Sequence, residues 1–483
     1  MPPNNQQTPI SIRAIGSNGV ILDSSLDEFL MPTGAVSWAI NCHFDQIGAV
    51  TTRDGVTILG AQLVDNSSIL GLHQFTDTGS GTNDKLIAAI TTKWMALVSG
   101  TWTDKRTGLT TGSKAHFTNF VDLVFGVNGV DAMNSYDGGA GNFGTTNCTS
   151  APAATFIDNF RTRVWAARTT ANSSRVYYSS IPDASYVILW TGSDSSYIDV
   201  APLDGEDIAG IKKFGSALHV FKNSYIYRIY SINQTEPDPQ IFVGTYSQES
   251  ISVAKDGMYW HHPSGIYKLS PGSSSPIEIS RPIYDIIKNI NRTYYDDVCS
   301  WTDDDHVYFG VGDITIYGIT INNCVLRWTI STQVWTVYKY AHEFTVGATY
   351  DTGSAIVRVV GDNDGNVHTF NSGKTDNGTI ISYELESRWL ILSGLRSELK
   401  TIRKMVGIHE NMEGATIGWR NGTMGRNQIE PIGQLESQQT LFENQSIQGN
   451  RIKLSVRGQN SGLPAIFQGY EVLEWINEGA IRS

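Results

Sequence analysis

The chain has 483 residues, of which 40% are hydrophobic, enough for a substantial core and for two to four domains. Only 17% of the residues are charged, whereas glycine (47 residues) and tyrosine (21 residues) are frequent, and this composition favours β-strands with many short loops over helical bundles. The formal net charge of −12, without any run of five basic residues, argues against tight binding to DNA and leaves open an acidic surface past which DNA slides.

Residues 1–60 are expected to form an extended N-terminal segment. The first residues lack the charged-then-apolar pattern of a signal peptide, and nowhere does an apolar run approach the roughly 20 residues that span a bilayer. We therefore expect a soluble protein made in a cytoplasm. Residues 38–55, WAINCHFDQIGAVTTRDG, combine turn-forming residues with a short strand at 49–52. This stretch is too short for a core of its own, so we expect it to pack on another part of the chain.

Residues 61–375 repeat one phrase, an apolar run, a tight turn and a tyrosine-rich run, which is typical of β-hairpins. The clearest copy is IKKFGSALHVFKNSYIYRIY, with its turn at 222–224, and another unit has Gly126–Gly129 as its expected turn. The spacing of roughly 35 to 50 residues is close to that of a four-stranded propeller blade. We predict an all-β fold, a degenerate six- to seven-bladed β-propeller, in which 283–290 is the best helix candidate. The units are at 68–102, 117–136, 154–180, 211–230, 251–269, 298–340 and 345–370.

Residues 376–483 show longer strands with clean alternation of apolar and polar side chains. Polar loops separate these strands. The pattern predicts a separate C-terminal β-sandwich of about a hundred residues. The expected strands are at 380–392, 401–409, 415–419, 451–457 and 465–475.

Paired carboxylates are the first catalytic candidates, because a glycoside hydrolase places two of them across the bond that it cleaves. These acids lie in loops or alternate along a strand, as solvated surface acids do. The sequence also lacks a nucleophile elbow, a Walker loop and a dinucleotide-binding fingerprint in the right context. We therefore predict a protein without catalytic, cofactor-binding or metal-binding residues. The acids considered are Asp204, Glu206, Asp207, Glu384 and Glu386.

Metal and sugar sites have weak candidates. Residues 362–366, DNDGN, resemble the start of a calcium loop, but 367–373 offers no acidic ligand, so we expect a hairpin turn and leave calcium open. His261 and His262 are adjacent and point to opposite faces of a strand. Six tryptophans are expected to fill blade cores, with sugar stacking as the alternative: Trp165, Trp190, Trp260, Trp301, Trp328 and Trp335.

The cysteines are far apart in sequence and form no metal-binding pair. We expect unpaired thiols in a reducing compartment, with a Cys299–Cys324 bridge across a hairpin as the alternative. The four are Cys42, Cys148, Cys299 and Cys324.

The stretch 38–55 resembles the N-terminal region of the tail nozzle proteins of short-tailed bacteriophages, also called tail tubular protein B or packaged-DNA stabilisation proteins. In that family an Ala-x-Asn segment precedes a Gly-x-x-x-x-Arg-x-Gly strand. Ala39-Ile40-Asn41 matches the first part here, and Gly48, Arg53 and Gly55 match the second. The order of propeller and terminal sandwich is also similar, so the resemblance covers most of the chain.

The resemblance implies a structural virion protein, made in the bacterial cytoplasm, without catalytic residues or cofactors. Six copies would form a ring below the portal and adaptor that continues the DNA channel and closes it until ejection. The implied partners are the adaptor protein, tail fibre or needle proteins, and the packaged DNA. Six copies would carry a charge of about −72, so DNA would pass an acidic lumen without tight binding.

Two other functions stay open. One is a carbohydrate-active or carbohydrate-binding propeller, such as a tail-associated glycan receptor protein, which the tryptophans and loop acids would suit. The other is a propeller scaffold that binds cellular proteins.

Overall fold

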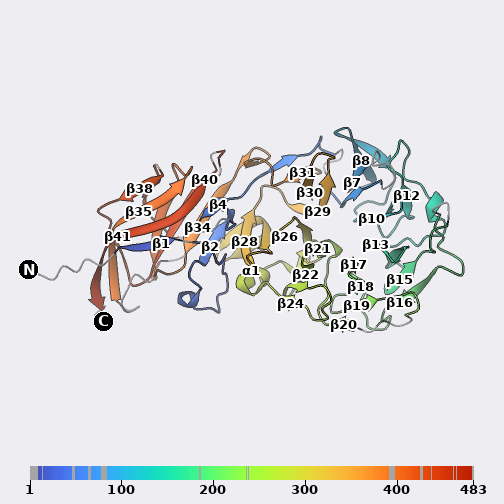
Figure 1. Ribbon diagram of the computed structural model, residues 1–483, viewed down its shortest axis with the longest axis horizontal. Coiled ribbons are helices and arrows are strands. Elements are labelled where there is room, and N and C mark those ends of the chain that lie inside the picture. The colour runs from blue at the N-terminus through green and yellow to red at the C-terminus, as the bar shows by residue number, and fades with distance from the viewer. Residues whose placement is uncertain are drawn as a thin grey trace, which may run out of the picture.

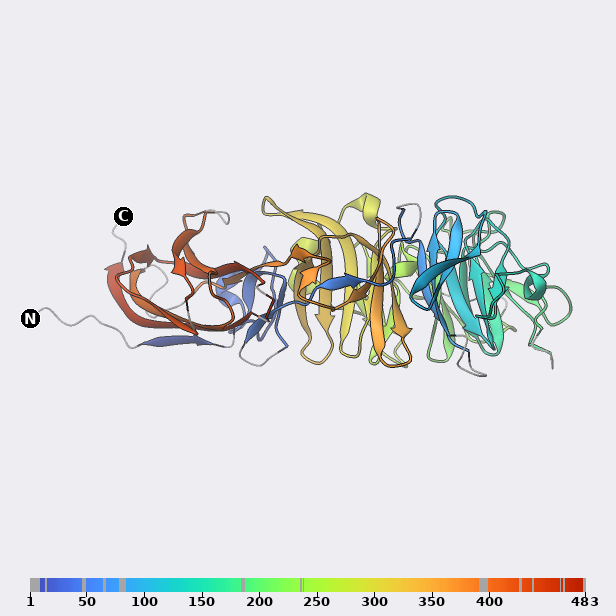
Figure 2. The ribbon, with the colours of Figure 1, turned by 90° about the horizontal axis from the view of Figure 1, so that it is seen from above.

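The computed structural model describes residues 9–480 except 14, 46–48, 64–66, 78–83, 184–186, 235–236, 238, 391–397, 425–427, 437, 461 and 464. Within these residues the fold is all-β, and the one α-helix, α1 (Tyr284–Ile287), lies inside the segment expected to be helical. Five short 3-10 turns accompany it: η1 (Glu28–Leu30), η2 (Thr146–Cys148), η3 (Gln248–Ser250), η4 (Arg281–Ile283) and η5 (Arg292–Tyr294). A ring of small sheets lies beside a layered body made of long strands (Figures 1 and 2).

The ring is a β-propeller, as predicted, and its described residues form seven blades (Figure 1). Blades 1 to 3 comprise β6 (Gly71–Phe75), β7 (Lys85–Ile90), β8 (Lys93–Val98) and β9 (Thr101–Arg106); β10 (His116–Phe120), β11 (Leu123–Val127) and β12 (Asn134–Tyr136); and β13 (Phe156–Phe160), β14 (Arg163–Ala167), β15 (Arg175–Tyr178) and β16 (Ser196–Asp199). Blades 4 to 6 comprise β17 (Gly210–Phe214), β18 (Ala217–Phe221), β19 (Ile226–Ile229) and β20 (Pro239–Ile241); β21 (Ser252–Ala254), β22 (Gly257–His262), β23 (Gly265–Leu269) and β24 (Ile277–Glu278); and β25 (Cys299–Thr302), β26 (His306–Ile316), β27 (Ile319–Thr329) and β28 (Val334–Lys339).

Blade 7 is completed by a strand from the beginning of the chain. β29 (Phe344–Asp351), β30 (Ile356–Asp362) and β31 (Val367–Phe370) pair in order, and β5 (Val56–Ile58) then pairs antiparallel with β31, Thr57 lying opposite Thr369. β32 (Thr375–Asp376) and β33 (Thr379–Ile380) extend this sheet. The innermost strand β29 contacts β6 of blade 1, which closes the ring. Residues 56–58, assigned above to the N-terminal segment, are therefore part of the propeller.

Blade interiors explain the apolar runs of the sequence. All five residues of β18 are buried, because a middle strand of a blade has a neighbouring blade on each face. The six tryptophans considered as sugar platforms also pack inside the structure. Each is buried, with an exposed fraction of 8% or less. They fill the core and offer no exposed ring face for a sugar.

The second body consists of two sheets that pack as a β-sandwich. One sheet contains β1 (Ile10–Arg13), β3 (Cys42–His43), β4 (Val50–Thr52), β35 (Glu398–Glu410), β38 (Gln439–Phe442), β39 (Ile447–Gly449) and β41 (Ile466–Ala480). The other contains β2 (Val36–Ile40), β34 (Ser382–Ser387), β36 (Thr416–Asn421), β37 (Glu430–Gln434) and β40 (Ile452–Gln459). The N-terminal segment thus supplies strands to both sheets.

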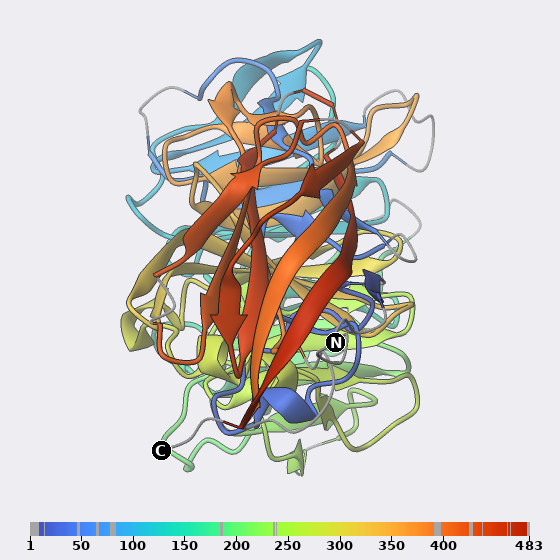
Figure 3. The same ribbon diagram turned by 90° about the vertical axis from the view of Figure 1, so that its left-hand side faces the viewer.

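The propeller and the sandwich share one hydrophobic core. The cluster runs from blades 5 and 6 through α1 into both sandwich sheets, and includes Phe309, Ile286, Trp38 and Trp475. β2 contacts β28, the outer strand of blade 6, and the Asn41 amide donates a 2.9 Å hydrogen bond to the Val337 carbonyl. The end-on view shows the sandwich strands in front of the propeller (Figure 3).

Candidate functional site

The residues that carry the family resemblance form a buried joint between propeller and sandwich. Asn41 has a positive φ of 59°, which Asn tolerates better than most residues. Its side-chain oxygen accepts 2.8 Å hydrogen bonds from Arg53 Nε and from the Lys339 amide of blade 6. Its side-chain amide donates a 2.7 Å bond to the Ser382 carbonyl at the start of β34. One side chain thus connects blade 6, the N-terminal segment and the sandwich.

Arg53 is the charged centre of this joint. Its guanidinium donates bonds of 2.8 and 2.6 Å to the two carboxylate oxygens of Asp376, and lies 3.7 Å from the centre of the Tyr340 ring. Only 1% of the Arg53 side chain and 5% of the Asp376 side chain are exposed. Burial alone would lower the pKa of Arg53, but Tyr340 and Asp376 outweigh burial and raise it. Arg53 therefore stays charged while buried.

Gly55 is required by close approach of two backbone segments. A Cβ atom there would lie 1.9 Å from the Thr375 carbonyl oxygen. Only glycine lets the chain pass this point and enter β5. Ala39 is a buried residue of β2, whereas Gly48, the other motif residue, lies outside the described part of the chain.

A second buried contact ties the N-terminal segment to blade 6. Arg327 of β27 donates a 2.6 Å bond to Asp45 Oδ2, and its other terminal nitrogen lies 3.0 Å from His43 Nδ1 and from the Tyr338 hydroxyl. Burial, followed by the charge of Arg327, lowers the pKa of His43 to about 3. A neutral His43 accepts from the guanidinium.

The innermost strands of the propeller surround a central channel. A volume of about 400 Å³ is lined by the innermost strands, with the 3-10 turn η3 contributing for blade 5. An adjoining hollow of about 610 Å³ shares His116 and Glu249 with it and carries Asp207, Asp296 and other acids on its wall. All seven blades contribute to this space.

One ion-pair cluster lies where the two hollows meet. Glu249 Oε1 is 2.9 Å from His116 Nε2, and Glu249 Oε2 is 3.5 Å from Lys114 Nζ. His116 Nδ1 lies 2.8 Å from the Thr155 carbonyl oxygen, and Lys114 Nζ lies 3.1 Å from Asp297. Burial raises the pKa of Glu249, but Lys114 and His116 outweigh it and keep that pKa below its usual range. Sequence analysis missed this cluster, because its members come from different blades.

The acids considered for catalysis are occupied by other partners. Glu386 accepts two 2.8 Å bonds from Arg420 and lies 3.2 Å from Lys453. Their neighbours are cations or hydrogen-bond donors, and although Glu206 and Asp207 lie on the wall of the 610 Å³ hollow, a protein side chain binds each of them there. The other contacts are Asp204 to Lys222 (2.6 Å), Glu206 to Ser224 (2.5 Å), Asp207 to Arg168 (3.3 Å) and Glu384 to Trp38 (3.0 Å).

Local geometry shows the state of the possible calcium loop, of the adjacent histidines and of the cysteines. Asp362 Oδ1 accepts from the backbone amides of Asp364 (3.0 Å) and Asn366 (2.7 Å), so the 362–366 stretch is a hairpin turn. His261 is buried while His262 is half-exposed, as expected for opposite faces. All four cysteines are buried free thiols, so the alternative Cys299–Cys324 bridge is not formed.

Comparisons with known proteins give structural matches of low similarity. No known protein family and no curated protein matches the chain. Solved structures that match include YCF48 bound to a D1 peptide, with 12% identity, coverage of 65% of this chain and 96% of that one, and a TM-score of 0.42. Another is YCF48 from Cyanidioschyzon merolae, with 11% identity, coverage of 65% of this chain and 98% of that one, and a TM-score of 0.43. A third is the computationally designed Ika8 protein (12%, 65%, 98%, 0.38). Such low similarity says nothing of a ligand or partner. Within the described residues, no helix has the length and apolar character needed to cross a bilayer.

The sheet topology and the buried joint define a class of protein, a seven-bladed β-propeller joined rigidly to a β-sandwich through its own N-terminal segment.

Proposed function

We propose that the chain is a non-enzymatic subunit of the tail nozzle of a short-tailed bacteriophage, which assembles into a ring on the adaptor and continues the DNA channel. The observation that carries this proposal is the joint of Asn41, Arg53 and Gly55. These residues of the family resemblance act together, in one buried place, to fix the propeller to the sandwich. A motif whose residues hold two domains together is what we expect in a structural virion component.

The shape of the subunit supports the same function. The shared core and the two charged contacts make the propeller and sandwich one elongated unit (Figure 2). Six subunits of this kind are suited to a cyclic assembly, in which each subunit contacts its two neighbours through two different faces. A flexible hinge between the bodies would leave the lumen without a fixed diameter.

The test is assembly. The purified full-length chain, alone and mixed with purified adaptor complexes of a short-tailed phage, is measured by native mass spectrometry and negative-stain imaging. Six-membered rings, free or on the adaptor, are the expected result. A protein that stays monomeric both alone and with the adaptor complexes would contradict the nozzle proposal.

A glycan-binding propeller is the second candidate, and the central channel favours it. Carboxylates, a histidine and a lysine face a hollow large enough for a small sugar. Binding and cleavage are measured on a broad glycan panel, with Glu249→Gln as the variant. Binding that Glu249→Gln abolishes would support this candidate, and no binding to any glycan would remove it.

A further inference from the structure

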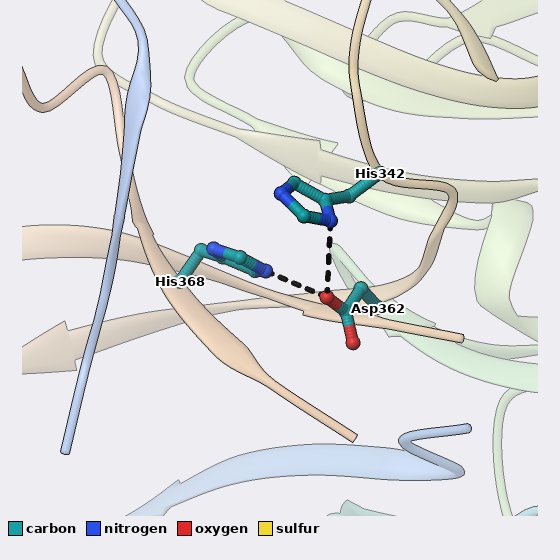
Figure 4. A group of neighbouring side chains, drawn as sticks. All are labelled: His342, Asp362 and His368. Atoms are coloured by element: carbon teal, nitrogen blue, oxygen red, sulfur yellow. Dashed lines mark hydrogen bonds and ion pairs between the residues drawn. The ribbon is translucent and has the colours of Figure 1, made fainter. Parts of the chain in front are cut away.

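Three side chains that are able to ligate a metal meet at one end of blade 7 (Figure 4). Asp362 ends β30, His368 lies in β31, and His342 lies in the connection between β28 and β29. One ligand atom from each lies within 4.8 Å of the other two. Asp362 Oδ2 is 2.7 Å from His368 Nε2 and 3.7 Å from His342 Nδ1. One carboxylate oxygen therefore faces two imidazole nitrogens.

The hairpin turn holds this oxygen in place. Oδ1 of Asp362 is bound by the two backbone amides of the turn, and Oδ2 accepts a 3.1 Å bond from the Asn366 side-chain amide. These bonds fix the carboxylate plane and aim Oδ2 at the histidines. Hydrogen bonds that orient a ligand in this way are typical of metal sites.

The three side chains are shielded from solvent to different degrees. Asp362 and His368 have no exposed side-chain surface, and His342 is 20% exposed. The two rings lie 4.8 Å apart at 34°. His342 Nε2 and His368 Nδ1 are buried and have no hydrogen-bond partner.

We propose that His342, Asp362 and His368 form a binding site for one divalent transition metal of the zinc type, with a fourth position left for water. Two imidazoles and one carboxylate suit zinc or cobalt better than calcium or magnesium, which prefer oxygen ligands alone. Zinc bonds of about 2.0–2.2 Å separate the ligand atoms of a tetrahedral site by roughly 3.4 Å. Side-chain rotations that move the ligand atoms by about 1 Å would therefore complete the site. The exposed edge of His342 is the route of entry.

Such a metal would brace the blade that closes the ring. His368 lies opposite Ile58 of β5, and His342 lies in the connection through which the chain enters blade 7. A metal bound to both therefore joins the closing hairpin to blade 6. An ion that binds only the folded chain also raises its stability.

The test uses the full-length chain after treatment with a chelator. Titration with Co²⁺ is followed by visible absorption, titration with Zn²⁺ by calorimetry, and the midpoint of thermal unfolding is measured with and without Zn²⁺. One ion per chain, a cobalt spectrum of low coordination number and a higher midpoint with Zn²⁺ are expected. His342→Ala removes the partly exposed ligand and should weaken binding roughly 100-fold or more.

His262→Ala in blade 5 is the matched control and should bind as the wild type does. His342→Gln, which keeps a polar side chain, replaces His342→Ala if the latter does not fold. Absence of a cobalt spectrum, or zinc binding that both His342 variants leave unchanged, would show that the three side chains are only a hydrogen-bonded structural cluster. Preference for Ca²⁺ over Zn²⁺ would also overturn the assignment.

Discussion

A buried charge is stable only while its partner is present, and this rule decides what Arg53 does for the molecule. Taking a guanidinium and a carboxylate out of water costs several kcal/mol for each ion, which mutual attraction and hydrogen bonds must offset. Arg53 and Asp376 satisfy this requirement with two short bonds. Asn41, Asp54 and Lys339 accept from the remaining donors. Removal of one partner leaves the other uncompensated.

Arg53→Ala should therefore lower the free energy of unfolding by about 3–5 kcal/mol, since it leaves Asp376 buried and unpaired. Urea unfolding followed by tryptophan fluorescence measures the change. Arg168→Ala, which breaks the exposed pair with Asp207, is the control and should cost less than about 1 kcal/mol. Equal losses in the two variants would contradict the assigned importance of the joint.

His261 makes the protein sensitive to acid. Burial, followed by the neighbouring His262, lowers its pKa from 6.5 to about 3, and neither ring nitrogen has a hydrogen-bond partner. Because the unfolded chain then binds the proton more tightly, stability is full above about pH 6.5 and falls between pH 6.5 and 3. Burial also lowers the pKa of His73 and of His219 to about 4, which adds to the same trend.

His261→Phe should remove one proton-binding group, so the free energy of unfolding should fall less steeply with decreasing pH. The slope should change by at most about 1.4 kcal/mol per pH unit. The free energy of unfolding of wild type and variant is compared at several pH values from about 4 to 8. The gap between the two proteins should change as pH falls below 6.5. A constant gap across the range would refute the assignment.

At the scale of elements, β5 completes blade 7, the blade whose innermost strand closes the ring against blade 1. Val56 of β5 is fully buried in the cluster that contains Tyr308, Val360 and Phe370, whereas Thr57 next to it is exposed. The strand is short, and it is held in blade 7 by that buried side chain and by pairing with β31 and β32.

Val56→Asp should detach β5, because it places an unpaired charge in an apolar core at a cost of several kcal/mol. Hydrogen exchange should then increase in β31, β29 and β6, the strands at the seam of the ring. Thr57→Asp, one residue away on the exposed face, should leave exchange nearly unchanged. Exchange confined to β5 itself in Val56→Asp would mean that the ring stays closed without it.

The sequence predicted local elements and missed distant partners. The propeller units were predictable because alternation within a hairpin is a local property. The turn expected at Gly126–Gly129 begins two residues later than predicted, because β11 runs through Val127, and Asn128 and Gly129 open the connection to β12, whereas the reversal at Val121–Asp122 was not predicted. Val121 has a positive φ of 54°, which β-branched residues disfavour, so no local signal marked that turn.

The candidate site shows the same limit. The motif residues Asn41, Arg53 and Gly55 were visible in the sequence, but Asp376, the carboxylate that makes Arg53 tolerable, lies in β32 after the last blade. Glu249 and His116 meet in the channel only because the ring brings blades 2 and 5 near each other. His342 and Asp362 come together through a turn whose bonds orient the carboxylate. No spacing rule predicts such pairs.

At the scale of the whole molecule, the net charge of −12 on an elongated subunit predicts behaviour toward DNA. The full-length chain should show no retention of linear duplex DNA at about 0.15 M salt, because phosphate binding requires clustered cations. Filter binding or a gel shift measures this. Retention that weakens steeply with added salt would reveal a basic surface and contradict an acidic lumen.

The position of β5 has a consequence for synthesis on the ribosome. β5 leaves the ribosome first, but β31 follows about 300 residues later, and β1 and β4 await β41 at the far end of the chain. At roughly 5–20 residues per second, β5 waits some 15 to 60 seconds for β31, and β1 waits about 20 to 90 seconds for β41. Neither the ring nor the sandwich is completed before translation is nearly over, so the nascent chain exposes strand edges throughout its elongation. Premature termination anywhere would release a polypeptide with two unfinished bodies, which cellular chaperones and proteases are well placed to bind or degrade.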